Sequence, residues 1–165
     1  MTLHIGLSDV GRESRDAEVL SACQEVVVVF CEMLDAGDAV GAFTLHDEDL
    51  AFYPPGAPAP VGRDAARTMG ERMLHAYDGR RTVHVVNNFV GRRIAPDRVE
   101  AQYVVTVYEL TRDAAGVAEE RDSPAIFALA HERAVFRRGD DGAWRYAEQR
   151  MLPLAPLSPF GKDRR

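Results

Sequence analysis

Residues 30–56 read FCEMLDAGDAVGAFTLHDEDLAFYPPG, and the first part of this stretch marks the end of a long helix. Apolar residues recur before it at helical spacing: Val19, Cys23, Val26, Val27, Phe30 and Leu34. Ser14 is typical of an N-cap, and Gly37 stands where a C-cap glycine is expected. The β-branched run at 26–30 is also compatible with a strand, but the caps and the periodicity favour a helix that ends at Asp35.

The rest of this stretch predicts a short helix, a strand and a loop. Asp38 can cap a second helix that runs through Phe43. A brief strand follows at residues 50–53. The prolines of residues 54–60, PPGAPAP, require a loop because proline fixes φ and removes a backbone donor.

The C-terminal half is rich in strands. Asp64 can cap a third helix over residues 65–77, and GDDG at 139–142 predicts a hairpin turn. The expected strands are residues 82–90, 99–110, 125–138 and 143–152, with a charged connection at 112–123. Helices followed by strands indicate an α+β domain, in which the first helix packs across a curved antiparallel sheet. A sheet wrapped around helices forms a cone, and its open end is expected to be a pocket.

Length and charge narrow the class of protein. The chain has 165 residues, which predicts one domain at 14–152 between a flexible arm at 1–13 and a tail at 153–165. The net charge of -6 argues against binding nucleic acid, and no apolar run approaches the ~20 residues of a membrane span.

Cys23 and Cys31 lie ~12 Å apart along one helix, too far for a disulfide. With no secretory signal at the start, we expect a cytoplasmic protein.

The sequence contains no recognisable cofactor or metal motif. It has no glycine-rich phosphate loop and no CxxC or HExxH spacing. His46 is followed by three acidic residues, and this cluster resembles a metal site on paper. We favour a solvated turn that caps the following strand, and therefore expect no cofactor and no metal.

The stretch at 30–56 resembles the opening of the SnoaL-like branch of the nuclear transport factor 2-like (NTF2-like) superfamily. VGRDAA before the third helix, RRTVHVVNN at the first long strand and DDGAWRYAEQRML at the end extend the resemblance over residues 16–152. It implies an α+β cone with a long N-terminal helix and two shorter helices on a curved antiparallel sheet. The superfamily includes scytalone dehydratase, ketosteroid isomerase, polyketide cyclases and proteins without activity, so the fold alone does not give the function.

The resemblance to scytalone dehydratase implies a catalytic pair, Asp35 and His84. The carboxylate would orient the imidazole and make it a stronger base, so that it can remove a proton or return one to a leaving hydroxyl. Tyr53 matches a tyrosine that holds a water or a substrate oxygen. Each residue also has a structural explanation: a helix-end carboxylate, a core histidine and a packed strand tyrosine.

The chain departs from that enzyme at two positions. Leu34 replaces the tyrosine before the aspartate, and the second histidine falls near Tyr108 or Glu109. His131 and Glu132 are adjacent on a strand, so only one can face the pocket, and the resemblance favours Glu132 as a second acid–base candidate. The alternative for Glu132 is an ion pair with Arg133 or Arg137.

The predicted pocket is mainly apolar and suits a hydrophobic or aromatic small molecule. The candidate substrate-binding residues are Phe30, Leu34, Met73, Tyr103, Tyr108 and Glu132. Further side chains that would line or support the pocket are Phe52, Met69, Phe89, Phe127 and Trp144.

Three functions remain open from the sequence. The first is a cofactor-independent dehydratase, isomerase or cyclase that acts on a polyketide-like, aromatic or terpenoid-like molecule through Asp35 and His84. The second is a structural subunit, because the same stretch resembles the β subunit of ring-hydroxylating dioxygenases. The third is a ligand-binding dimer without turnover. A homodimer is expected because Val104, Thr106 and Val135 make the outer sheet face apolar.

Overall fold

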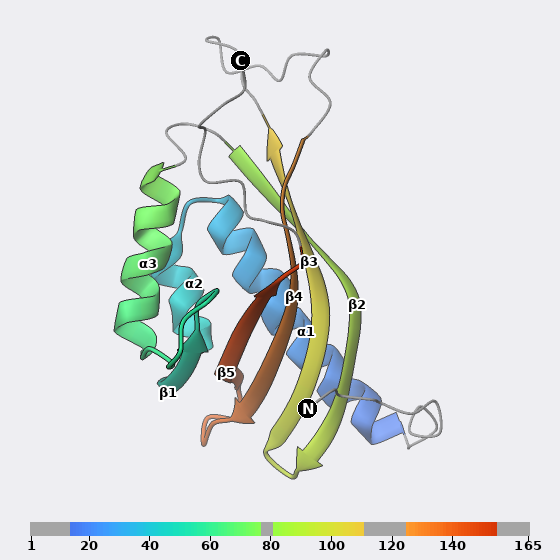
Figure 1. The fold of residues 1–165 in the computed structure, drawn as a ribbon. Coiled ribbons are helices and arrows are strands. Elements are labelled where there is room, and N and C mark those ends of the chain that lie inside the picture. Colours follow the sequence, from blue (N-terminus) through green and yellow to red (C-terminus); the bar gives the residue numbers. More distant parts are fainter. Residues whose placement is uncertain (1–13, 77–80, 111–124, 155–165) are drawn as a thin grey trace, which may run out of the picture.

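The computed structural model describes residues 14–76, 81–110 and 125–154 (Figure 1). The elements are α1 (Ser14–Asp35), α2 (Ala39–Ala42), the 3-10 helix η2 (Phe43–Leu45), β1 (His46–Tyr53), α3 (Arg63–Ala76), β2 (Arg81–Ala95), β3 (Arg98–Leu110), β4 (Ala125–Arg138) and β5 (Trp144–Pro153). The predicted arm, the connection at 112–123 and most of the predicted tail lie outside the described residues.

The strands form one curved, open sheet in the order β1-β5-β4-β3-β2. The four long strands pair antiparallel, as predicted, but β1 pairs in parallel with β5, so the sheet is mixed. A strand pattern shows that a segment is extended but does not specify its partner or direction. Figure 1 shows α1 crossing behind the sheet, with α2 and α3 beside β1.

The core lies between α1 and the sheet. One face of α1 is buried, which confirms the helical interpretation of residues 26–30; its buried residues are Cys23, Val27, Phe30, Cys31 and Leu34. Alternate residues of β3 face this helix: Val99, Ala101, Tyr103, Val105 and Val107. Among the helices that the structure describes, none is both long and apolar enough to cross a bilayer.

The C-terminus of α1 is fixed by a glycine cap. Gly37 has φ of 82° and its N–H donates to the carbonyl of Leu34, while the N–H of Asp38 donates to the carbonyl of Met33. This bond pair is the Schellman arrangement, and it makes Asp35 the last residue of the helix. Asp38 then accepts a bond from the N–H of Gly41 at 2.7 Å and caps α2, as predicted.

Several strand boundaries differ from the sequence prediction. β1 begins at His46, four residues before the predicted start, so HDED is part of a strand and not a solvated turn. β5 continues through Pro153, where the tail was expected to begin, and the N–H of Leu154 donates to the carbonyl of Leu129. The GDDG turn is confirmed: Gly142 has φ of 80°, and the N–H of Gly139 donates to the carbonyl of Ala143.

β2 is longer than predicted because a bulge interrupts it without ending it. Asn87 pairs with Val104 and Val90 pairs with Gln102, so two residues of β2 stand opposite one residue of β3. Asn88 adopts a positive φ of 53° at this point. The bulge turns Phe89 toward the core, where its ring stacks on Tyr103 at 5.9 Å.

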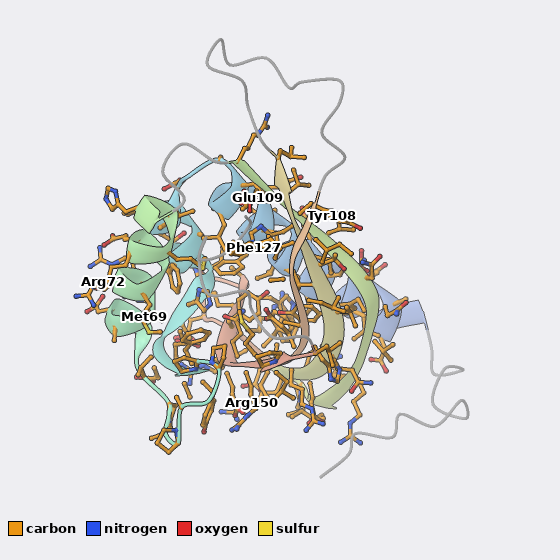
Figure 2. The ribbon with its side chains drawn as sticks, turned by 45° about the horizontal axis from the view of Figure 1, so that its top comes forward. Met69, Arg72, Tyr108, Glu109, Phe127 and Arg150 are labelled. Atoms are coloured by element: carbon orange, nitrogen blue, oxygen red, sulfur yellow. The ribbon has the colours of Figure 1, made fainter. Side chains whose placement is uncertain are left out.

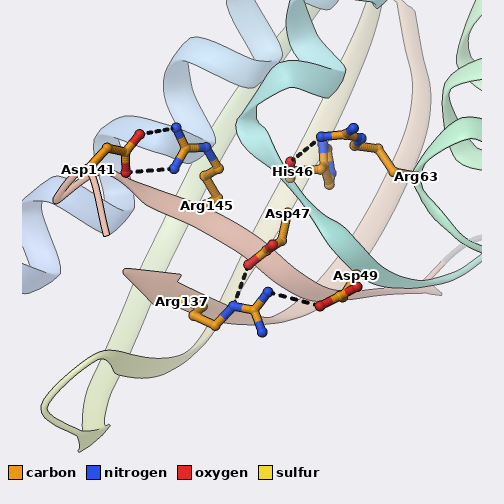
Figure 3. A network of polar contacts seen from close by, with 7 residues as sticks. All are labelled: His46, Asp47, Asp49, Arg63, Arg137, Asp141 and Arg145. Carbon is orange, nitrogen blue, oxygen red and sulfur yellow. Dashed lines mark hydrogen bonds and ion pairs between the residues drawn. The ribbon is translucent and has the colours of Figure 1, made fainter. Parts of the chain in front are cut away.

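An arginine on β4 holds β1 across the intervening β5 (Figure 3). Arg137 Nε donates to Asp47 Oδ2 at 2.5 Å, and Arg137 Nη2 contacts Asp49 Oδ2 at 3.4 Å. The bond from Arg137 lowers the pKa of Asp47 below its ordinary value of 3.8. Beside it, Arg145 of β5 pairs with Asp141 of the hairpin turn.

The Asp47–Arg137 pair is expected to stabilise the protein in a pH-dependent way. Asp47→Asn should lower the free energy of unfolding at pH 7 by about 0.5–1 kcal/mol, because the pair is only partly buried. A carboxyl whose pKa is lowered in the folded state stabilises above its ordinary pKa, and this contribution is lost as the pH falls through the folded value. Urea unfolding of both proteins at pH 7 and pH 3 measures the difference.

The more exposed Arg92–Glu100 pair is the matched control, and Glu100→Gln should cost less at pH 7. A cost for Asp47→Asn that is equal at both pH values would contradict the assigned role of the ion pair.

Candidate functional site

Asp35 and His84 meet where the end of α1 packs against β2. His84 Nδ1 and Asp35 Oδ1 lie 2.6 Å apart, and the backbone N–H of His84 donates to Asp35 Oδ2 at 2.8 Å. Thr82 Oγ1 donates to Asp35 Oδ1 at 3.1 Å. The two side chains are 18% (Asp35) and 10% (His84) exposed, so the pair is shielded and still accessible. The contact between these two residues is the one expected from the sequence.

The contact determines which nitrogen of His84 can act as a base. A carboxylate only accepts hydrogen bonds, so the proton of a neutral His84 lies on Nδ1. Nε2 then carries the lone pair and can take a proton from a bound molecule. Because Asp35 is also bonded to the backbone N–H of His84, the imidazole and the carboxylate cannot easily move apart.

A second polar cluster is buried between β3, β4 and β5. Glu132 is 4% exposed, and its Oε2 accepts from Tyr103 Oη at 3.0 Å and from Gln149 Nε2 at 2.8 Å. Tyr103 Oη also lies 3.1 Å from Tyr146 Oη. Burial raises the pKa of Glu132, and the bonds from Gln149 and Tyr103 only partly oppose this. The inward orientation favoured for Glu132 agrees with this structure.

His46 extends this cluster into the core. It is fully buried, its Nε2 contacts Gln149 Oε1 at 2.9 Å, and its ring stacks on Phe43 and Tyr146, each with centroids 4.8 Å apart. Burial lowers its pKa to about 4, so the imidazole is neutral at pH 7. His46 is therefore a core residue.

The other candidate substrate-binding and lining residues differ in how far they are buried. Phe30, Leu34 and Tyr103 are buried on the inner face. Met73 is half-buried on α3, whereas Met69 is 42% exposed and does not line the interior (Figure 2).

The structure does not bring Tyr53 to the dyad. It pairs with Arg150, whose guanidinium lies 3.6 Å from the centre of its ring. The neighbouring Gln149 faces the core, so Tyr53 and Arg150 face the other side of the sheet.

Tyr108 also lies on the opposite face from the dyad. Residues alternate along β3, and the neighbouring Val107 faces the core. Glu109, the second possibility at this position, pairs with Thr82 and shares its face. The choice between Tyr108 and Glu109 depends on how β3 pairs with β2, and the sequence alone does not give this pairing.

Four polar residues of the interior were not singled out from the sequence: Thr82, Tyr146, Gln149 and, as a core residue, His46. Each lies on the inward face of its strand, and Thr82, Tyr146 and Gln149 share that face with another polar residue of the same strand. The sequence signal for such residues is a polar side chain at a strand position whose two neighbours are expected to be exposed. Within the described ranges, no group of three or more His, Cys, Asp or Glu residues could hold a metal ion.

A scan against protein families and a search of curated proteins find no match. Solved structures are similar in fold. An NTF2-like protein with a cystatin-like fold from Novosphingobium aromaticivorans is 20% identical, with a TM-score of 0.66, over 94% of this chain and 95% of its own. The chain has the NTF2-like fold.

Two further structures share this fold. A putative scytalone dehydratase from Novosphingobium aromaticivorans has a TM-score of 0.65 and 14% identity, and the match covers 84% of this chain and 86% of that one. A protein from Catenulispora acidiphila in complex with S-DNPA has a TM-score of 0.68 and 17% identity, and the match covers 83% and 94%. The expected architecture is thus confirmed, with β1 as a parallel addition.

The buried His46 predicts a loss of stability in mild acid. The unfolded chain binds a proton at His46 near pH 6.5, whereas the folded protein does so near pH 4, so the stabilising effect is complete above pH 6.5 and is lost between these values. We expect wild type to lose up to about 3 kcal/mol more than His46→Gln between pH 7 and pH 4. Urea unfolding across this range measures the difference, with His75→Gln on the exposed side of α3 as control. Parallel curves for wild type and His46→Gln would rule out the buried neutral state.

Proposed function

We propose that the protein is a cofactor-independent acid–base enzyme, a dehydratase, isomerase or cyclase, that acts on a hydrophobic polyketide-like, aromatic or terpenoid-like molecule. The observation that carries this proposal is the bond between Asp35 and His84, which leaves one imidazole nitrogen as a base. The shared fold with a putative scytalone dehydratase and with a protein that binds S-DNPA supports a small-molecule ligand.

In this proposal His84 Nε2 removes a proton from carbon next to a carbonyl group of the substrate. The electron pair of the C–H bond moves toward that carbonyl, and Asp35 stabilises the imidazolium that forms. Asp35 is suited to this task because three donors fix its carboxylate before the reaction begins. Phe30, Leu34, Met73 and Tyr103 are proposed to contact the apolar part of the substrate.

The same geometry favours an enzyme over a structural subunit or a passive binding protein. The contact with Asp35 occupies Nδ1 of His84, and 10% of the side chain remains exposed, which favours a base over a fully buried core histidine. A carboxylate at the end of a helix could equally accept bonds from neighbouring backbone N–H groups alone. Asp35 instead binds the imidazole at 2.6 Å.

Turnover of a bicyclic β-hydroxy aryl ketone tests the proposal, because loss of water from this probe gives a naphthol with its own absorbance. Asp35→Asn and His84→Gln should each lower kcat by about 10²–10⁴-fold, the usual contribution of a general base. Circular dichroism and urea unfolding check that both variants fold. His75→Gln, on the exposed side of α3, should keep full activity. Folded dyad variants with wild-type rates would refute the proposed role.

We also propose that the protein is a homodimer joined through the outer face of the sheet. Thr106 is only 9% exposed on this face, whereas Val85 beside it is 37% exposed. Val104 and Val135 lie on the same side. Val85, Val104 and Val135 are apolar side chains that remain at least partly exposed on this face, and a second copy would cover them.

Substituting a charge for an apolar residue on this face should separate the dimer. Val85→Glu is expected to raise the dissociation constant by at least tenfold, because a carboxylate would be buried without a partner. Sedimentation velocity over a dilution series measures it, and Val28→Glu on the exposed side of α1 is the matched control. A wild-type protein that stays monomeric at all concentrations would contradict this proposal.

A further inference from the structure

Glu132 is a buried acid that the dyad chemistry does not use. Its two donors, Tyr103 Oη and Gln149 Nε2, bind the same oxygen, Oε2. An oxygen that accepts two hydrogen bonds is a poor place for a proton. A proton carried by this carboxyl group therefore lies on Oε1.

The donors are themselves held in place. His46 Nε2 contacts Gln149 Oε1 at 2.9 Å, so the amide presents its NH₂ group to Glu132. Tyr146 Oη lies 3.1 Å from Tyr103 Oη and can donate to it, which directs the Tyr103 hydroxyl hydrogen to Glu132. Four side chains thus fix the orientation of one carboxyl group.

Glu132 and His84 lie on the same face of the sheet, because Glu132 pairs with Tyr103, His84 pairs with Val107, and both of these partners are buried on the core side of β3. A positive charge on His84 lowers the pKa of Glu132, and negative charges on Glu132 and Asp35 both raise the pKa of the Cys31 thiol. Cys31, on the buried face of α1, is therefore within electrostatic reach of both carboxylates. Burial has the largest effect on Glu132 and raises its pKa, which favours the protonated form.

We propose that Glu132 is the second acid–base residue of the same site, a neutral acid that gives the proton on Oε1 to a substrate oxygen while His84 takes a proton from carbon. This inference rests on the proposed function, which names His84 as the base but names no proton donor. Glu132 would be that donor. Gln149, Tyr103, Tyr146 and His46 are positioning residues, because they act through Glu132.

The step balances for the β-hydroxy aryl ketone. His84 Nε2 takes the proton next to the carbonyl group, and the freed electron pair forms the carbon–carbon double bond. The C–O bond to the hydroxyl breaks, and its electron pair stays on oxygen. Glu132 Oε1 gives that oxygen a proton, and water leaves. The imidazolium then returns its proton to the Glu132 carboxylate through water, which restores both groups.

The groups that face Glu132 set the expected pH dependence. They are Tyr103 of β3, Tyr146 and Gln149 of β5, Cys31 of α1, and His84 of β2. Burial raises the pKa values of Tyr103 and Tyr146 well above 10, so both tyrosines stay neutral. Because the acid form of Glu132 is the active one, kcat should fall as the pH rises through its pKa.

Two readouts on the full-length protein test this assignment. The ¹³Cδ resonance of Glu132, identified by its loss in Glu132→Gln, should titrate above the ordinary glutamate range near 4.3. In the kcat profile with the β-hydroxy aryl ketone, the alkaline limb should have the same midpoint. Glu132→Gln should lower kcat by about 10²–10⁴-fold and remove this limb, whereas Glu100→Gln should leave the profile unchanged.

Gln149→Met gives a test that does not need the Glu132 variant to fold. The bond from Gln149 lowers the pKa of Glu132, so its loss should move the carboxyl titration and the alkaline limb upward together. A titration that shifts without the limb, or Glu132→Gln at full rate beside inactive dyad variants, overturns the inference and leaves the proposed function standing. Dyad variants at full rate would overturn the proposed function itself.

Discussion

The carboxylate of Asp35 is the interaction on which the arrangement of α1 and the sheet depends. It accepts the Thr82 hydroxyl, the backbone N–H of His84 and the His84 imidazole. These donors lie near the start of β2, whereas the carboxylate belongs to the last residue of a helix of 22 residues. One side chain thus joins the end of the longest helix to the edge strand of the sheet, and burial of the intervening apolar face follows from that alignment.

The position of Asp35 is set by glycine and aspartate residues next to it. Gly37 takes a left-handed conformation that ends α1, and Asp38 immediately starts α2. Gly41 is needed at the third position, since a Cβ there would come within 2.1 Å of the Asp38 carboxylate. The chain therefore turns at once toward β1, which brings His46 beneath Phe30 and Phe43. The end of α1, the start of α2 and the burial of His46 in the core therefore all depend on a few consecutive residues.

Local signals predicted the elements well and the partners less well. The end of α1 at Asp35 and the GDDG hairpin depend on caps and turns within a few residues, and both were predicted from the sequence. The parallel pairing of β1 depends on β5, almost a hundred residues later, and no local pattern specifies it. The early start of β1 also involves distant residues, because Arg137 of β4 bonds to Asp47 and Asp49 within HDED.

The candidate site shows the same division. The resemblance to scytalone dehydratase implied the pair of Asp35 and His84, and the two side chains are in contact. The same resemblance placed Tyr53 at the site, but the face of Tyr53 depends on the register of β1 with β5, which sets it beside Arg150. The resemblance favoured an inward Glu132, and its pairing with the buried Tyr103 agrees with that expectation.

The two carboxyl groups, Asp35 and Glu132, differ in their hydrogen bonds and in their access to solvent. Asp35 accepts three hydrogen bonds, one of them from the His84 imidazole, and 18% of its side chain is exposed to solvent. Glu132 has two neutral donors and almost no solvent, conditions that favour the uncharged acid. In the proposed reaction His84 takes one proton and Glu132 gives another, and this division of roles requires a difference between the surroundings of Asp35 and Glu132. The fold produces it by placing one carboxyl group at a helix end and the other at the centre of the sheet.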